Sequence, residues 1–232
     1  MSELLDCLKK VELFSDMPEK CLLTQICACG SVQLYMKEQL LFAPQQKVNR
    51  LGVVLSGKVR LLHLFPDGNY SLMSTVDAGG VIGAELACTR TQLAPYHAVA
   101  SADTEIFWLP VTVLMQQGSL PETHRLTCLS HLLTMIAHEN IKREYRLAIL
   151  AQKSLRERIL VYLTMQANRL QQTSFSVAFS REEMASYLCV NRSALSHELS
   201  LMQREGLISF RKNRFTLHHW LPLPSDRHIP GQ

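Results

Sequence analysis

Four side chains near the C-terminus have the types and the spacing that contact with DNA bases requires. Arg192, Ser193, Ser196 and His197 share one face of any helix that covers this segment. An Arg can donate two parallel hydrogen bonds to guanine, a Ser can contact a base or a phosphate, and a His can donate to an acceptor on either. A helix with such donors in its first turn fits the major groove. The chemistry predicted for this segment is therefore recognition of DNA.

A basic hairpin follows this helix. Residues 207–210 and 215–217 are predicted to be its two strands, and the turn between them carries the cations Arg211, Lys212 and Arg214. Such cations suit a phosphate backbone, which positions a protein on DNA without reporting its sequence. A short helix, a tight turn, a longer helix and a basic hairpin form the pattern of a winged helix-turn-helix. The alternative is a winged helix that is used only for protein contacts.

Capping residues predict where these helices begin and end. Ser180 and Glu183 form a capping box that opens a short helix through Leu188. Asn191 is suited to the N-cap of the next helix, and Gly206 is suited to the left-handed position after its end. The candidate DNA-binding residues of this region are Arg181, Asn191, Arg192, Ser193, Ser196, His197, Arg211, Lys212 and Arg214.

The excess positive charge lies in this same region. Residues 155–221 contain nine Lys and Arg against five Asp and Glu, whereas residues 1–154 contain fourteen of each kind. This asymmetry suits a module that meets phosphate.

A long helix is predicted before this module, after Pro121. Its seam follows an a/d heptad pattern, in which a polar Asn140 would fix the register and Arg143 would be awkward to bury. The seam predicts a dimer interface, and the alternative is one amphipathic helix packed on its own domain. The interface residues are Leu126, Leu129, Leu133, Ile136, Asn140, Leu147 and Leu150. A second capping box, Ser154 with Glu157, predicts a break at 151–154 and a new helix to about Arg169.

The N-terminal half has a different pattern of apolar and turn-forming residues. Residues 4–30 have helical spacing, and the apolar runs 51–55, 59–65 and 106–109 are bounded by turn signals such as Ser56-Gly57. Several short strands at such spacing predict a sandwich or a barrel rather than alternating strands and helices.

The whole chain sets the broad class. Its 232 residues suit two domains, and no apolar run reaches the roughly 18 residues of a membrane span. The N-terminus lacks the features of a signal peptide, so we expect a soluble, cytoplasmic protein with reduced thiols. Catalytic motifs such as a P-loop or G-x-S-x-G are absent, so we expect no enzyme. A second class is a ligand-binding module that acts through a protein partner.

Three segments carry a resemblance to a known family. Residues 54–60 (VLSGKVR), residues 80–86 (GVIGAEL) and residues 191–199 (NRSALSHEL), the last followed by Glu205-Gly-Leu-Ile208, resemble the CRP/FNR regulators in order and spacing. The resemblance extends from about residue 10 to residue 220. It implies an α+β chain with an N-terminal double-stranded β-helix (a β-roll or jelly roll) as sensor, a long dimerisation helix and a C-terminal winged helix-turn-helix.

The resemblance also implies an organisation and partners. The expected parts are a β-roll effector domain over residues 1–120, a dimerisation helix and hinge over 121–153, a DNA-binding domain over 154–221 and a flexible tail over 222–232. The expected partners are a second copy, double-stranded DNA with a two-fold symmetric operator, an unknown small effector and, for an activator, RNA polymerase.

The sequence departs from the family pattern in the sensor. Cyclic-nucleotide members hold the cyclic phosphate with an Arg-Ser pair, where this chain has Tyr96 and His97, and Ala84 replaces the ribose-binding Glu unless Glu85 takes that role. We therefore expect that cyclic AMP is not the effector. The candidate pocket residues are Gly83, Ala84, Glu85, Leu86, Tyr96 and His97. In the reading helix, His197 stands where relatives often carry Arg, so a donor is kept and a bidentate fork is lost.

The thiols and histidines give a weaker alternative. Cys7, Cys21, Cys27 and Cys29 invite comparison with the iron–sulfur members, and with a redox- or metal-responsive regulator, but their spacing does not suit a metal knuckle. His124, His131 and His138 recur every seven residues, about 10 Å apart along a helix, so neighbours cannot share one ion. We expect no metal and no cofactor.

Overall fold

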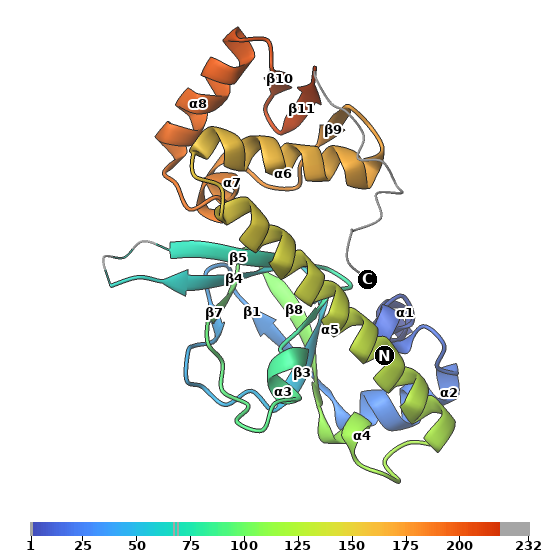
Figure 1. Ribbon diagram of the computed structural model, residues 1–232. Coiled ribbons are helices and arrows are strands. Elements are labelled where there is room, and N and C mark those ends of the chain that lie inside the picture. Colours follow the sequence, from blue (N-terminus) through green and yellow to red (C-terminus); the bar gives the residue numbers. More distant parts are fainter. Residues whose placement is uncertain (1, 67, 69, 219–232) are drawn as a thin grey trace, which may run out of the picture. The chain divides into compact units, whose positions relative to one another are not determined.

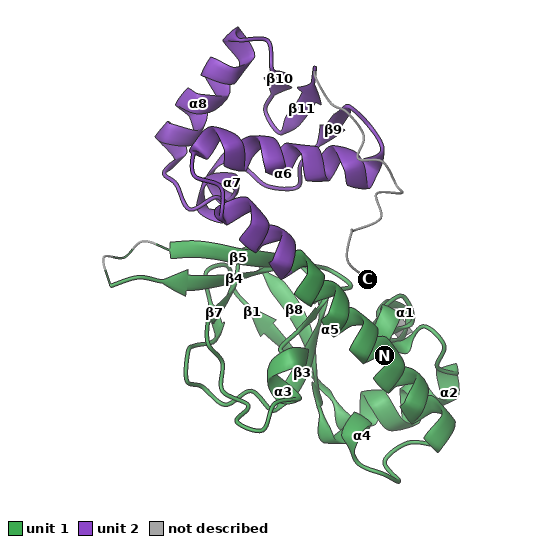
Figure 2. Cartoon of the chain, viewed as in Figure 1, with its two compact units in different colours: residues 1–142 green, residues 143–232 purple. Residues whose placement is uncertain are grey.

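The computed structural model describes residues 2–66, 68 and 70–218, and Figure 1 follows the order of its elements. The chain divides into two compact units, residues 1–142 and residues 143–232 (Figure 2). The boundary falls inside the long helix α5 (Glu122–Leu150), which therefore contributes to both units. The predicted four-part division stays a prediction, and the tail predicted for residues 222–232 lies outside the described residues.

The first unit is built on two antiparallel four-stranded sheets, which confirms the predicted β-roll class. One sheet has the order β1-β8-β3-β6 and the other the order β2-β7-β4-β5. The strands are β1 (Ser31–Tyr35), β2 (Leu40–Phe42), β3 (Arg50–Ser56), β4 (Lys58–Leu64), β5 (Tyr70–Asp77), β6 (Val81–Ile82), β7 (His97–Ala100) and β8 (Thr104–Pro110). Gly57 makes the turn between β3 and β4 with a φ of 82°, and a Cβ there would lie 2.4 Å from the Asp103 carbonyl oxygen.

Short helices surround these sheets. They are α1 (Ser2–Lys9), the 3₁₀ turn η1 (Glu12–Phe14), α2 (Glu19–Cys21), the π-helical turn η2 (Leu22–Cys27), α3 (Ala84–Ala87) and α4 (Thr112–Met115). One core lies among α1, η1, η2, the face of β3 and β8, and the buried side of α5. A second core fills the space between the sheets and contains Phe42, Tyr96 and Trp108.

The second unit contains the last turns of α5 and the elements α6 (Leu155–Leu170), β9 (Ser174–Ser176), α7 (Arg181–Tyr187), α8 (Arg192–Arg204), β10 (Ile208–Arg211) and β11 (Arg214–Leu217). The strands form an antiparallel sheet in the order β10-β11-β9. Ile149 of α5 is buried in the same core as Ile159 of α6 and Leu195 and Leu199 of α8. The winged helix-turn-helix predicted from the sequence is confirmed.

The predicted helix starts are also confirmed. The Ser154 and Ser180 side chains each accept a hydrogen bond from the backbone N–H three residues later, while Glu157 and Glu183 accept from the N-cap N–H. Residues 151–154 are non-helical, so the predicted break in the helical stretch is present. Gly206 follows α8 with a φ of 74°, the conformation that favours glycine at this position.

Candidate nucleic-acid interface and sensor site

The start of α8 is held by its own N-cap. The Asn191 side-chain oxygen accepts a hydrogen bond of 2.7 Å from the Ala194 N–H and one of 2.8 Å from the Ser193 hydroxyl. Cys189 gives the preceding turn a φ of 57° and is exposed. Asn191 and Ser193 thus fix the first turn of α8, whatever further contact they make.

The first two turns of α8 present donors to solvent. Arg192, Ser193 and His197 are exposed and Ser196 is half-buried, while Leu195, Leu199 and Met202 point into the core. The two sets alternate with the helical repeat, so core packing on one side orients the donors on the other. The residues predicted to contact bases thus share one side of α8, and their contact with DNA stays a prediction.

The wing is a hairpin with a two-residue turn. Arg211 pairs with Arg214 across it, Lys212 has a φ of 54°, and all three cations are exposed. The Asn213 side chain donates to the Val177 carbonyl at 3.0 Å, and the Val177 N–H donates to the Asn213 carbonyl at 2.9 Å. The turn is therefore tied to the segment that leads into α7.

Arg181 belongs to the same corner, but its guanidinium faces the wing. It donates to the Lys212 carbonyl at 2.8 Å and lies 5.1 and 5.4 Å from the ring centroids of Phe210 and Phe215. Burial lowers the pKa of Arg181, and the positive charge of Arg192 lowers this pKa further. The Arg181 side chain therefore braces the wing. No local pattern predicts this contact, because it depends on residues about thirty positions away in the chain.

A groove of about 510 Å³ adjoins this corner. Arg181, Met184, Lys212 and Phe215 are among its lining residues, together with the capping pair Ser180 and Glu183. The groove is lined on one side by the start of α7 and on the other by the wing turn.

The candidate sensor residues lie mostly in the core between the two sheets. Tyr96 is only 2% exposed, and its hydroxyl donates a hydrogen bond of 2.5 Å to Glu85 on α3. Its ring lies 5.9 Å from that of Phe42. Gly83, Ala84 and Leu86 are buried as well. Glu85 and Tyr96 are thus brought together, with the acid bonded to a neutral phenol.

His97 and Arg90 complete the neighbourhood. His97 is half-buried on β7, and its buried Nδ1 makes no hydrogen bond within the described part of the chain. Arg90 lies exposed in a bend. None of the pocket residues predicted from the sequence is a cation that could pair with a cyclic phosphate through a fork.

Helix α5 has a packed side and an exposed side. Leu126, Leu133 and Leu147 are 54%, 69% and 60% exposed, and Asn140 is exposed with them. Leu129, Ile136 and Leu150 are half-buried, so the predicted seam is shared between the outer face and the edge of the core. The opposite side buries Cys128 and Leu132.

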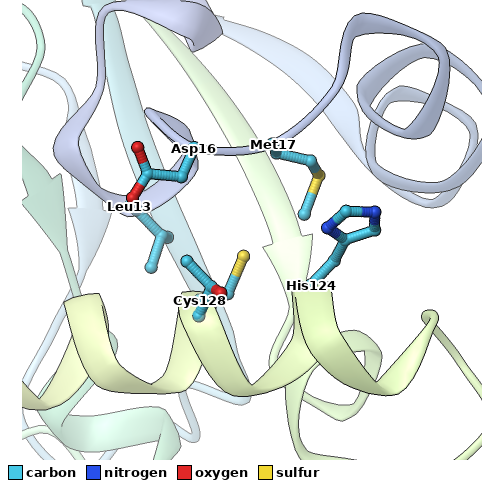
Figure 3. A pocket seen from close by; sticks show the side chains of 6 residues that line it. Leu13, Asp16, Met17, His124 and Cys128 are labelled. Atoms are coloured by element: carbon cyan, nitrogen blue, oxygen red, sulfur yellow. The ribbon is translucent and has the colours of Figure 1, made fainter.

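The packed side of α5 carries two of the three histidines that recur every seven residues, His124 and His131. His131 lies 3.3 Å from the Asp16 carboxylate and 3.4 Å from the Leu13 carbonyl oxygen. Figure 3 shows His124 and Cys128 on α5 opposite the segment of Asp16 and Met17. These residues attach α5 to the N-terminal helices. Burial raises the pKa of the Cys128 thiol to about 11.

The seven cysteines are free thiols, and Cys29, Cys88 and Cys189 are exposed. Among the described residues no group of three or more His, Cys, Asp or Glu is placed to hold a metal ion. Within the same residues, no helix has the length and hydropathy to cross a membrane.

Comparisons with known proteins give two domain matches. The cyclic nucleotide-binding domain matches residues 32–117, and the Crp-like helix-turn-helix domain matches residues 157–222. Together these matches cover more than half of the chain and include the core between the two sheets and helix α8.

Individual relatives agree with these matches. The nitrogen fixation regulation protein FixK of Azorhizobium caulinodans is 25% identical over 199 residues, which are 83% of this chain and 77% of FixK. The structure of FixK2 from Bradyrhizobium japonicum is similar with a TM-score of 0.61 and 20% identity, over 82% of this chain and 93% of FixK2. The c-di-GMP responsive regulator CLP of Xanthomonas campestris is similar with a TM-score of 0.66 and 18% identity, over 86% of this chain and 99% of CLP. At these identities the two structures show the shared fold.

Proposed function

The chain belongs to the CRP/FNR family of DNA-binding transcription regulators, and we propose that it acts as a homodimer on a two-fold symmetric operator. The observation that carries this proposal is the outer face of α5, where Leu126, Leu133 and Leu147 are more than half exposed in the single chain. A regular row of exposed leucines on one helix suits a second copy of the same helix. Two copies would present two reading helices, which suits two half-sites about one helical turn apart.

In this proposal Arg192 and His197 contact base edges, while Arg211, Lys212 and Arg214 contact phosphates. Their exposure and the separation of the two sets, one on α8 and one on the wing, support this division of roles. A regulator of chromosomal genes acts in the cytoplasm, and RNA polymerase is the further partner expected if the output is activation.

Selection from random duplex DNA with the full-length protein tests this proposal. We expect an enriched motif made of two inverted half-sites, and a sedimentation coefficient of a dimer both alone and on the selected DNA. A single unrepeated motif bound by a monomer would contradict the dimer, and enrichment of no motif would contradict sequence reading.

We also propose that the sensor does not respond to cyclic AMP. The cyclic phosphate carries a full negative charge, which is strongly penalised in a core unless it is paired and hydrogen-bonded. Glu85 is an acid that already accepts the Tyr96 hydroxyl, so the matching position offers a negative group and a filled volume. The sensor is then either filled by its own side chains or adapted to a different small molecule.

Calorimetric titration with cyclic AMP tests this second proposal, and cyclic di-GMP is a useful parallel ligand because CLP is described as responsive to it. We expect no heat of binding for cyclic AMP at micromolar concentration, and no change in affinity for the selected operator. Micromolar binding of cyclic AMP with tighter operator binding would overturn the proposal, and would direct attention to Arg90 and His97 as phosphate partners.

A further inference from the structure

One guanidinium connects the first turn of α6 to two separate turns of the reading helix. Arg156 donates from Nε to Glu198 at 2.6 Å and from its two terminal nitrogens to Glu205 at 2.7 and 2.9 Å. Glu198 lies in the middle of α8, and Glu205 is its C-cap residue. All three bonds join charged groups, and the pair with Glu205 is bidentate, which fixes orientation as well as distance.

The two acids hold α8 from the side away from Arg192, Ser193 and Ser196. They are seven residues apart, which is two turns and about 10 Å along the helix. With 3.6 residues per turn, Glu198 and Glu205 point to one side of α8 while Arg192, Ser193 and Ser196 point to the other. A link at two points along the axis restrains both the tilt and the rotation of the helix, whereas a link at one point restrains neither fully.

Glu205 does not stabilise helix α8 by its position at the end of the helix. An acid at the C-terminal end of a helix lies at the negative end of the helix dipole, which is unfavourable. The Arg156 fork offsets this cost, since it brings a positive charge to that end. The three side chains are partly exposed, at 36% for Arg156, 19% for Glu198 and 45% for Glu205. Ion pairs with such exposure contribute little to folding stability.

We propose that Arg156 is a positioning residue for DNA reading, which sets the angle of α8 in the major groove through Glu198 and Glu205. This proposal rests on the proposed reading by α8. Precise placement matters more for base contacts than for phosphate contacts, because a bidentate contact to a base edge requires both partners in one plane. We call the three hydrogen bonds from Arg156 to Glu198 and Glu205 the Arg156 clamp. Loss of this clamp should therefore weaken binding to the operator more than binding to unrelated DNA.

The experiment compares Arg156→Ala and Arg156→Lys with the matched control Arg169→Ala, which removes an exposed Arg from the same helix. Each full-length variant is titrated on the selected operator and on unrelated duplex DNA over a range of salt concentrations. We expect Arg156→Ala to weaken operator binding about tenfold per half-site, as for one impaired base contact, with the same salt slope and with unrelated DNA bound as before. Lys supplies the charge without the fork, so Arg156→Lys should remain impaired.

A second comparison excludes direct phosphate contact by Arg156. If the clamp acts as a unit, Arg156→Ala with Glu205→Ala should bind the operator no more weakly than Arg156→Ala alone. If Arg156 instead contacts phosphate, Arg156→Ala should weaken binding to all DNA alike and flatten the salt slope, and Arg156→Lys should restore it. Either that result or an unchanged operator affinity of Arg156→Ala would overturn the clamp.

The wild-type protein separates the two proposals. If it selects no motif, reading by α8 is wrong. If it selects a motif and the Arg156 variants bind that motif as tightly as the wild type, only the clamp is wrong. Melting temperatures close to that of the wild type are expected for all variants, and a large loss for Arg156→Ala would assign the residue a structural role instead.

Discussion

In the sensor unit, Tyr96 donates its hydroxyl to Glu85 inside the core, whereas in the DNA-binding unit Arg192 and His197 leave their side chains exposed. In both regions the local backbone positions these side chains: Gly83 takes a left-handed φ before α3, and Asn191 caps α8. The difference is in the polar side chains. Tyr96 and Glu85 of the first region are bonded to each other, whereas Arg192 and His197 of α8 point outward. The function of each region therefore depends on which donors remain available.

The largest effect is expected from Leu133→Glu. This substitution should disrupt the proposed dimer of reading helices and leave the β-roll around Tyr96, which needs no second copy, unchanged. The substitution places a charge in the middle of the outer face of α5, where a second copy would bury it. We expect monomers by sedimentation and operator binding weaker by on the order of a hundredfold or more, because the two reading helices no longer bind together.

The Tyr96 environment should be unchanged in this variant. The near-ultraviolet circular dichroism of the protein is its readout, and an exposed Thr134→Glu on the same helix is the control for added charge. A stable dimer with Leu133→Glu would place the interface elsewhere.

Arg192→Ala tests the reading helix alone. Loss of one bidentate base contact should cost about 1–3 kcal/mol per half-site and relax the preference at one base position. Repeating the selection from random DNA measures both effects, and Arg204→Ala, in the last turn of the same helix, is the matched loss of charge. If the selected motif were identical to that of the wild type, Arg192 would not read a base.

The winged helix-turn-helix could be predicted almost completely from the sequence, because its determinants are local. Capping boxes at Ser180 and Ser154, the N-cap Asn191 and Gly206 each act within a few residues, and each was found where it was predicted. The β-roll could be predicted only as a class, because strands such as β6 and β7 are short and pair with residues far away in the chain.

The contacts between side chains and groups on separate elements could not be predicted from spacing. Tyr96 meets Glu85 through the fold of the β-roll, and Arg181 meets the Lys212 carbonyl through the fold of the wing. The Arg156 clamp left a partial signal, since two acids seven residues apart on one helix share a face. Nothing in the sequence indicates which cation they would bind.

Tyr96→Phe tests the sensor alone. The change keeps the ring and removes the hydroxyl that Glu85 accepts, so the free energy of unfolding should fall by about 1 kcal/mol. Denaturant titration measures this loss, and operator binding should remain as in the wild type. Tyr145→Phe, on the exposed side of α5, is the matched control. A change in operator affinity with Tyr96→Phe would instead indicate that this hydrogen bond takes part in signalling to DNA.

Lys212→Ala separates general affinity from reading within the DNA-binding unit. Each phosphate contact contributes about 0.9 to the slope of log affinity against log salt, so losing the contact in both copies should flatten that slope by about 2. The selected motif should not change. An unaltered slope would show that this cation of the wing does not reach the phosphate backbone.

The smallest effect concerns two thiols, one in each region. Cys128 is buried against the N-terminal helices, where burial raises its pKa to about 11, whereas Cys189 is exposed in the turn before α8. Because the thiolate is the reactive form, iodoacetamide at pH 8 should modify Cys189 readily and Cys128 only after unfolding.

The buried Cys128 thiol also makes the free energy of unfolding depend on pH. Its folded pKa is higher than the value of about 8.5 of a free thiol, so its contribution is complete below about pH 8.5 and decreases as the pH rises toward 11. Peptide mapping of the modified sites, with Cys128→Ala and Cys189→Ala as references, checks the rates, and denaturant titrations from pH 7 to pH 10 check the stability. Equal rates for the two thiols in the folded protein would contradict the burial of Cys128 and, with it, the packing of α5 on the sensor unit.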